Sequence, residues 1–326
     1  MKIKQAIAIF SASLLLLSGC SSPKNQAELT YTDVLFDTVI SVQILDNADE
    51  ELIQGCADIC RKYDVMFSRT NEESEISKIN HAGGKPVEVS DDTISIIETG
   101  IYYGDLSNGA FDITIGSVTN LWDFKSEEHI IPSVDSLKTA VSKVNYKDII
   151  IKDNTVQLSD PDMMIDVGAL AKGYIADRLK DYLLDNGIEH ALINLGGNVL
   201  VVGNKPDGSD FNIGIQKPFD ETGKPLTSVK LNDQTVVTTG IYQRYFTTDD
   251  VLYHHILDPH TGYPCNNTLY SVSIITDSSL DADALSTTIF LLGFEKGMEL
   301  INHLDGAEAL FITDDMEIHY SDNFPH

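Results

Sequence analysis

Residues 163–184 read MMIDVGALAKGYIADRLKDYLL, and this stretch carries three structural signals in order. Residues 163–167 are apolar around one aspartate and predict a short strand, and Gly168 predicts a turn. Residues 169–184 have helical periodicity and stop at Asn186-Gly187. A strand that turns directly into a helix aims backbone N–H groups, and here also Lys172, at one point. The stretch therefore favours an anionic ligand at the start of this helix.

On both sides of this stretch, predicted strands and helices are mixed without an internal repeat or a Pro/Ser-rich linker. We expect a strand over 34–45, helices over 48–67, 74–80 and 91–107, a hairpin over 148–158, two strands within 191–202, several short strands over 211–275, helices over 281–292 and 295–304, and a closing hairpin over 307–320. This mixture predicts one α+β domain of mainly antiparallel or mixed sheets covered by helices.

Composition narrows the function classes. The chain has 326 residues and is 42% hydrophobic, which is enough to build a large core and excludes a small disulfide-stapled scaffold. It carries 22 Lys plus Arg against 50 Asp plus Glu, so its formal net charge is −28. Such a field repels phosphate backbones and anionic lipid headgroups. We therefore expect no nucleic-acid partner and no charge-driven adhesion to membranes.

The N-terminus predicts export and a lipid anchor. Lys2 and Lys4 precede an apolar run of about 12 residues, too short for the roughly 20 that a spanning helix needs. The run ends in Leu17-Ser-Gly-Cys20, which resembles the lipobox of bacterial lipoproteins. We expect residues 1–19 to be a signal peptide, Cys20 to be lipidated, 21–29 to be a tether and 30–326 to be an extracytoplasmic domain held at a bacterial membrane. A plain signal peptide is the alternative, and which membrane carries the anchor stays open.

Eight short motifs follow one another along the chain: Phe36-Asp-Thr38, Ser68 before Ser74-Glu-Ile-Ser77, Ala110-Phe-Asp-Ile-Thr-Ile-Gly116, Asp166-Val-Gly-Ala-Leu-Ala-Lys-Gly-Tyr174, Asn194-Leu-Gly-Gly-Asn198, Thr239-Gly-Ile-Tyr-Gln-Arg244, His255-Ile-Leu-Asp-Pro-His-Thr-Gly-Tyr-Pro264 and Asp281-Ala-Asp-Ala-Leu-Ser-Thr-Thr288. Neither a dinucleotide-binding GxGxxG nor a P-loop is among them. In this order the motifs resemble the ApbE family of FAD:protein FMN transferases over roughly residues 30–320.

The resemblance implies a reaction. Family members bind FAD and Mg²⁺ and move the FMN half of FAD to a Ser or Thr hydroxyl of an acceptor protein, releasing AMP. For such a phosphoryl transfer, a cation clamp and a positioned nucleophile supply most of the catalysis. Two other outcomes stay open: hydrolysis of FAD to FMN and AMP, and a lipid-anchored flavin-binding protein without turnover.

The resemblance also assigns residues. Asp283 and Thr287 are four residues apart in a helical segment, so their oxygen atoms share one face and suit Mg²⁺, with the Ala169 carbonyl as the third protein ligand that the family implies. His255 matches a histidine needed for transfer, as general base or as positioner. Lys172 is the phosphate-side candidate, and Thr70 stands where the family has an aromatic residue. The complete set of matching FAD-binding positions is Phe36, Thr70, Ala110, Phe111, Asp112, Asp166, Lys172 and Ile256.

Overall fold

The computed structural model describes residues 29–125, 128–220 and 222–325. The predicted signal peptide, Cys20 and residues 21–28 of the predicted tether lie outside the described residues. Leu29, the last residue of that tether, begins the first strand.

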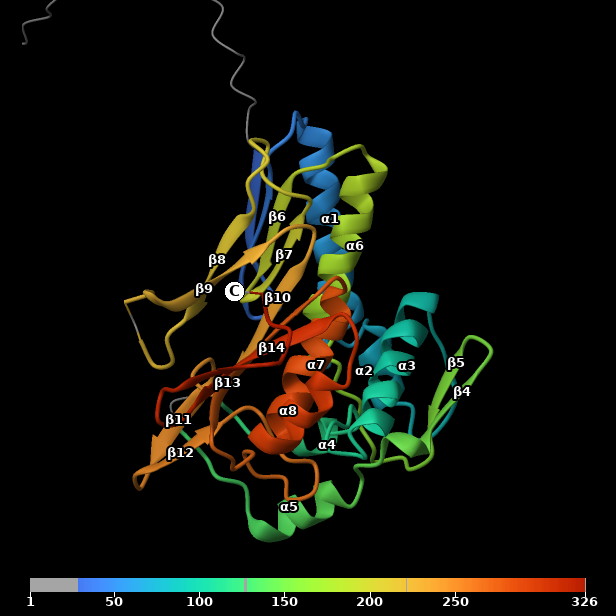
Figure 1. Cartoon of the computed structure of the whole chain (residues 1–326). Coiled ribbons are helices and arrows are strands. Elements are labelled where there is room, and N and C mark those ends of the chain that lie inside the picture. Colours follow the sequence, from blue (N-terminus) through green and yellow to red (C-terminus); the bar gives the residue numbers. More distant parts are fainter. Residues whose placement is uncertain (1–28, 126–127, 221, 326) are drawn as a thin grey trace, which may run out of the picture.

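An eight-stranded sheet forms the centre of the molecule (Figure 1), in the order β1-β2-β6-β7-β10-β13-β14-β15. Every neighbouring pair in it is antiparallel. Its strands are β1 (Leu29–Leu35), β2 (Thr38–Ile44), β6 (Ala191–Leu195), β7 (Asn198–Val202), β10 (Thr235–Gly240), β13 (Leu269–Thr276), β14 (Ala307–Thr313) and β15 (Ile318–Tyr320).

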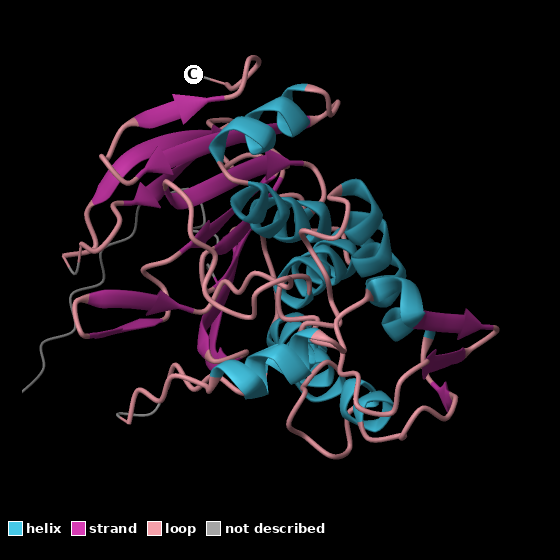
Figure 2. Cartoon of the chain, turned by 90° about the horizontal axis from the view of Figure 1, so that it is seen from below, coloured by secondary structure: helices cyan, strands magenta, loops and turns pink. Residues whose placement is uncertain are grey.

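Both faces of this sheet are covered. Helices gather on one side of the sheet (Figure 2), and the main core packs this face of the sheet against α1 (Glu50–Met66), α6 (Ala171–Asp185), α7 (Ser279–Leu292) and α8 (Phe294–Asn302). The hairpin of β8 (Phe211–Gln216) and β9 (Pro225–Leu231) covers part of the other face. Alternate residues of β7 show this division, since Leu200 packs on the helix side and Val199 and Val201 pack on the hairpin side. Two-sided burial explains why β7 reads as an unbroken apolar run after Asn198.

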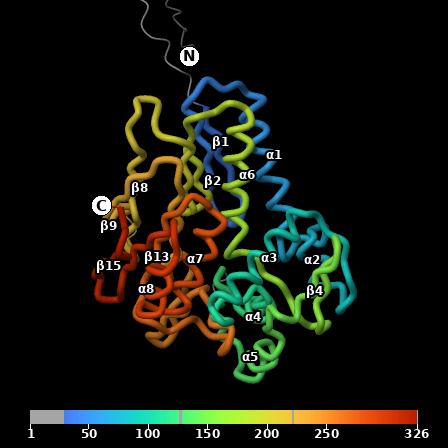
Figure 3. Tube along the Cα trace, turned by 45° about the vertical axis from the view of Figure 1, so that its right-hand side comes forward, coloured from blue at the N-terminus to red at the C-terminus, as the bar shows by residue number. Residues whose placement is uncertain are grey.

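The remaining elements lie beside and below the central sheet and its helices (Figure 1 and Figure 3). They are α2 (Glu75–Asn80), α3 (Asp91–Leu106), α4 (Gly116–Thr119), α5 (Val134–Val141), the 3-10 turn Tyr146–Asp148, a small sheet of β3 (Val87–Glu88), β5 (Thr155–Leu158) and β4 (Ile149–Lys152), and a hairpin of β11 (Tyr245–Thr248) and β12 (Val251–His254). A buried aromatic cluster around Trp122 and Phe246 attaches the β11–β12 hairpin to the segment before α5.

The predicted α+β class is confirmed, and two predicted strands are wrong. The strand expected over 34–45 is a hairpin, because Phe36 and Asp37 turn the chain with positive φ angles of 54° and 61°. The N–H of Phe36 donates to the Asp64 carboxylate at 2.9 Å, a tertiary contact that holds a turn without glycine. The strand expected over 163–167 makes only one isolated bridge, between Met164 and Ile115.

A side chain takes the place of a strand partner at 163–167. The Asn80 amide oxygen accepts from the Ile165 N–H at 2.7 Å, and its nitrogen donates to the Ile165 carbonyl at 2.9 Å. Asn80 thus satisfies the polar groups that a neighbouring strand would otherwise pair.

Helices α6 and α7 are joined by an exchange of carboxylates. Asp177 of α6 accepts from the N–H groups of Ser279 and Leu280 at 2.8 and 2.9 Å, which caps the start of α7. Asp283 of α7 accepts from the Gly173 N–H at 2.9 Å, in the first turn of α6. A Cβ atom on Gly173 would lie 2.2 Å from the Ser279 carbonyl oxygen, so only glycine lets the helices approach this closely. We call this arrangement the reciprocal cap.

The reciprocal cap predicts a stability difference between two aspartates of α6. Asp177→Ala should lower the free energy of unfolding by about 1–2 kcal/mol, because the first N–H groups of α7 lose their acceptor. Asp181→Ala removes the same charge one turn further on, where the exposed side chain pairs with Arg178. It should cost less than about 0.5 kcal/mol. Urea unfolding followed by circular dichroism measures both, and equal losses would contradict the cap.

Candidate functional site

The candidate site is built around Asp283, whose side chain is 5% exposed. One carboxylate oxygen is held by Gly173 in the reciprocal cap, and the other lies 3.5 Å from the Lys172 ammonium. Lys172, at the start of α6, therefore points to the buried carboxylate of Asp283 on α7. In the sequence, these two residues belong to separate motifs and lie 111 positions apart.

The turn before α6 is less open than the sequence suggested. The N–H of Gly168 donates to Asp166 at 2.9 Å, and those of Leu170 and Ala171 donate to the Val167 carbonyl at 2.9 Å each. Gly173 donates to Asp283, as described above. The expectation that free N–H groups of this turn would face an anionic ligand is thus wrong for these four groups. An anion near α6 would meet Lys172 instead.

Thr287 and Ala169, the other two predicted metal ligands, belong to α7 and to the turn before α6. Thr287 lies one turn after Asp283 on α7, is half-buried, and its hydroxyl lies 3.1 Å from that of Thr239 in β10. Ala169 lies in the turn that leads into α6. Oxygen atoms alone make up this donor set. In the described parts of the chain, no group of three or more His, Cys, Asp or Glu side chains could hold a metal ion.

Asp166 is engaged by a cation that the sequence analysis missed. The Arg69 Nε lies 3.0 Å from one Asp166 oxygen, to which the Thr119 hydroxyl also donates at 3.1 Å. The Arg69 guanidinium also donates to Asn120. Arg69 has no periodic or spacing signal in its polar loop, so only its position beside Asp166 reveals it. Its neighbour Thr70 is exposed, and its hydroxyl lies 3.4 Å from that of Ser68.

The Ala110–Asp112 segment has mainly internal partners. Phe111 is buried in the main core, and Ala110 is half-buried. The Asp112 carboxylate accepts from the Thr114 N–H and hydroxyl at 2.7 and 2.6 Å and from the Tyr146 N–H at 2.9 Å. Burial raises the pKa of Asp112, although these hydrogen bonds oppose the rise. A pocket of about 210 Å³ lies against this segment, and His260 lines it too.

His255 follows β12 directly and is half-buried. Its Nδ1 lies 3.3 Å from the Arg244 carbonyl oxygen, which can only accept, so we assign the proton to Nδ1 and the lone pair to Nε2. Burial lowers the pKa of His255 to about 3, and the charges of Arg244 and Lys172 add to the effect. The imidazole is therefore neutral near pH 7.

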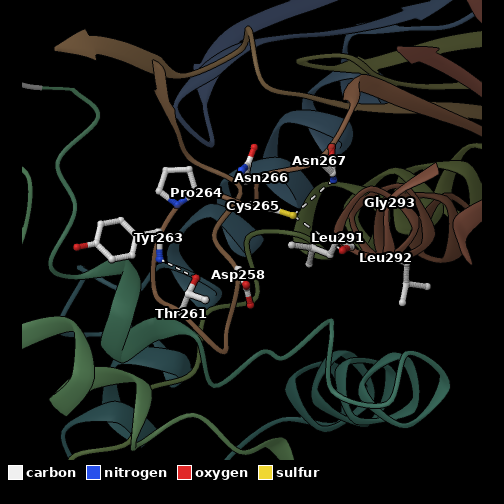
Figure 4. A pocket seen from close by; sticks show the side chains of 10 residues that line it. All are labelled: Asp258, Thr261, Tyr263, Pro264, Cys265, Asn266, Asn267, Leu291, Leu292 and Gly293. Atoms are coloured by element: carbon white, nitrogen blue, oxygen red, sulfur yellow. Dashed lines mark hydrogen bonds between the residues drawn. The ribbon is translucent and has the colours of Figure 1, made fainter. Parts of the chain in front are cut away.

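The neighbours of His255 are buried. His254 packs on Phe290 of α7, and its Nε2 lies 3.1 Å from the Cys265 carbonyl. Ile256 is 5% exposed, and its carbonyl accepts from the Cys265 N–H at 2.8 Å. Behind this loop lies a pocket of about 460 Å³, where Cys265 stands between Asn267 and the end of α7 (Figure 4). No residue predicted as a site residue lines that pocket.

Phe36 comes from the edge of the sheet formed by β1 and β2 and packs, half-buried, on the main core. It lies in the β1–β2 turn, and the next residue, Asp37, lies 2.6 Å from the Lys125 ammonium and 4.0 Å from the Arg244 guanidinium. The structure thus ties the Phe36 turn to the start of the β11–β12 hairpin. Arg244, like Arg69, was not among the predicted binding residues.

Comparisons with known proteins agree with this architecture. The sequence model of the ApbE family matches residues 36–311. A Klebsiella pneumoniae protein named FAD:protein FMN transferase is 36% identical over 292 residues, which are 89% of this chain and 90% of that protein. A Treponema pallidum protein of the same name is 30% identical over 335 residues, covering 97% of this chain and 92% of that protein.

Two solved structures show the same fold. The ApbE protein of Thermotoga maritima superimposes with a TM-score of 0.84 at 30% identity, over 91% of this chain and 98% of that one. A flavin transferase ApbE from Vibrio cholerae gives a TM-score of 0.80 at 27% identity, with the same coverage. The chain therefore belongs to the ApbE family.

Proposed function

We propose that this protein transfers the FMN moiety of FAD to a Ser or Thr hydroxyl of an extracytoplasmic acceptor protein, with Mg²⁺, and releases AMP. The observation that carries the proposal is the buried Asp283 carboxylate beside Lys172. A carboxylate this deeply buried needs cationic partners, and among the described residues Asp283 pairs only with the Lys172 ammonium, at a long 3.5 Å. The named activity of the relatives supports the same chemistry.

The residues present fit a magnesium ion. Asp283, Thr287 and the Ala169 carbonyl would hold it, since Mg²⁺ prefers hard oxygen ligands and takes few of them from protein. When bound, it would neutralise charge on the phosphate oxygens of FAD. The reciprocal cap already fixes one Asp283 oxygen on Gly173, so the second oxygen has a defined direction.

His255 would act on the acceptor hydroxyl. Its Nε2 lone pair can take the hydroxyl proton while the hydroxyl oxygen forms a bond to the phosphorus of the FMN half. The bond from that phosphorus to the AMP oxygen breaks, and AMP leaves. The Arg244 carbonyl fixes the tautomer that this step requires.

The membrane anchor is part of the proposal. Among the described residues, no helix is long and apolar enough to cross a bilayer. Without Lys2 and Lys4 the net charge of −28 becomes −30, so charge would not hold the domain at anionic lipids. Lipid on Cys20 would supply the attachment at the extracytoplasmic side of a bacterial membrane.

The overall function is tested by incubating the purified protein with FAD, Mg²⁺ and an extract of the source cells. In-gel flavin fluorescence should appear on a specific acceptor band, and AMP should accumulate in proportion. AMP without a fluorescent band would indicate hydrolysis, and FAD binding without AMP would indicate a carrier.

For His255→Ala, we expect transfer to fall by roughly 10²- to 10⁴-fold while FAD affinity changes little, because a general base acts on the rate. AMP release and FAD titration are measured in parallel. His303→Ala, at the exposed end of α8, serves as the control. Since the pKa of His255 is lowered to about 3, wild-type kcat/KM should show no loss from His255 protonation between about pH 5 and 8. Lost FAD binding in His255→Ala would reassign the residue to the pocket.

For Asp283→Asn, we expect AMP release to fall by roughly 10²- to 10³-fold, since the charged ligand is lost while an oxygen remains for Gly173. Thr287→Val should weaken the binding of Mg²⁺, so an excess of Mg²⁺ should partly restore the rate of AMP release. Asp281→Asn makes the same charge change on α7, where the carboxylate contacts Tyr103 instead, and should stay active. AMP is measured against Mg²⁺ concentration, with circular dichroism as the fold control. Wild-type turnover that survives EDTA would remove the metal from the mechanism.

For Cys20→Ser, we expect a soluble or uncleaved protein, because only the Cys20 thiol can carry the lipid. Fractionation of membranes and immunoblotting of the mature chain measure this. A correctly cleaved Cys20→Ser protein that still sediments with membranes would contradict the anchor.

A further inference from the structure

The Thr239–Arg244 motif joins β10 to β11 and ends in Arg244, whose guanidinium lies 4.0 Å from Asp37 and whose carbonyl faces His255. The Arg244 carbonyl accepts from the His255 N–H at 3.1 Å, one step beyond the Tyr245–His254 pair of the β11–β12 hairpin. Residues directly opposite each other in an antiparallel pair project to the same face. The Arg244 and His255 side chains therefore leave the same side of the hairpin base. The Arg244 charge also contributes to the lowered pKa of His255, as expected for near neighbours.

The charges at the site do not balance. Arg69 pairs with Asp166 at 3.0 Å, and Lys172 pairs with Asp283 at 3.5 Å. Lys125 and Arg244 share Asp37, but Lys125 lies 2.6 Å from the carboxylate oxygen and Arg244 lies 4.0 Å from it. Among the described residues, these four cations thus meet three carboxylates, and Arg244 has the most distant partner of the four.

The Arg244 guanidinium is also accessible. Its side chain is 42% exposed, and within the described ranges its guanidinium makes no hydrogen bond of normal length to a protein acceptor. A planar fork of N–H donors in this state matches the oxygen atoms of a phosphate. Because the chain as a whole has a net charge of −28, a local excess of positive charge would attract an anionic ligand to this one place.

The geometry points to Arg244 as a catalytic residue that binds the phosphate of the FMN half of FAD, the phosphate that becomes the phosphoester. This inference rests on the proposed function, because it places the attacked phosphorus within reach of both His255 and Arg244. The acceptor oxygen bonds to that phosphorus, the bond to the AMP oxygen breaks, and the proton goes to His255. Arg244 donates hydrogen bonds to the non-bridging oxygens of this phosphate and thereby stabilises their negative charge.

The test compares the binding of FMN with that of riboflavin, which lacks the phosphate, by quenching of flavin fluorescence in the presence of Mg²⁺. Wild type should prefer FMN. Arg244→Gln should reduce this preference by about 10- to 100-fold while riboflavin affinity stays the same, since a charge-assisted hydrogen bond is lost. Arg244→Lys keeps the charge without the fork and should recover part of the preference.

Two controls separate contact from general effects. Lys125→Gln removes a cation from the same carboxylate and should lower the preference for FMN much less than Arg244→Gln does. Asp37→Asn removes the anion that Lys125 and Arg244 share, and asparagine tolerates the positive φ of this position. This variant should not lower the preference for FMN. If Arg244 served only to hold Asp37, Asp37→Asn would reproduce the loss seen in Arg244→Gln.

The outcomes are distinguishable from a failure of the proposed function. An unchanged preference in Arg244→Gln, an equal loss for FMN and riboflavin, or an equal loss in Lys125→Gln would overturn the role of Arg244. Normal AMP release by a wild type that does not prefer FMN would overturn that role alone. A wild type that binds neither flavin and releases no AMP would overturn the proposed function and, with it, this inference.

Discussion

The exchange of carboxylates between α6 and α7 organises this molecule. Each helix offers unpaired N–H groups at its start, and each receives a carboxylate from the other, Asp177 in one direction and Asp283 in the other. The exchange satisfies donors that would otherwise be buried without partners. It also fixes Asp283 in the core with one oxygen committed to Gly173. The candidate metal ligand is thus oriented by a contact that stabilises the fold.

Charge is the second constraint. A chain with a net charge of −28 repels a phosphate-bearing substrate at long range, so attraction must come from cations gathered at the site. The fold gathers Arg69, Lys125, Lys172 and Arg244 from four different segments. Three of them are held by carboxylates, which keeps their side chains in place. Arg244 remains available for a ligand next to the neutral imidazole of His255.

Sequence reasoning succeeded where the signal was local. The helix at 48–67 and the hairpins at 148–158 and 191–202 follow from apolar periodicity and turn residues, and the structure has them as α1, β4–β5 and β6–β7. It failed where distant residues decide the backbone. The 34–45 segment turns at Phe36 because Asp64 accepts its N–H, and 163–167 stays outside any sheet because Asn80 binds Ile165. Neither partner is visible from the segment itself.

For the site, the order of the motifs determined which family the chain belongs to and which residues to examine. The i, i+4 spacing placed Asp283 and Thr287 on one helix face, because helix geometry is local. Only the tertiary structure showed that Asp283 caps α6, that Arg69 binds Asp166, and that Arg244 lies opposite His255 without a close anion. The physical reason is that ion pairs and caps join residues far apart in the chain. Sequence fixes their chemical type, whereas packing decides which of them meet and which charge is left without a partner.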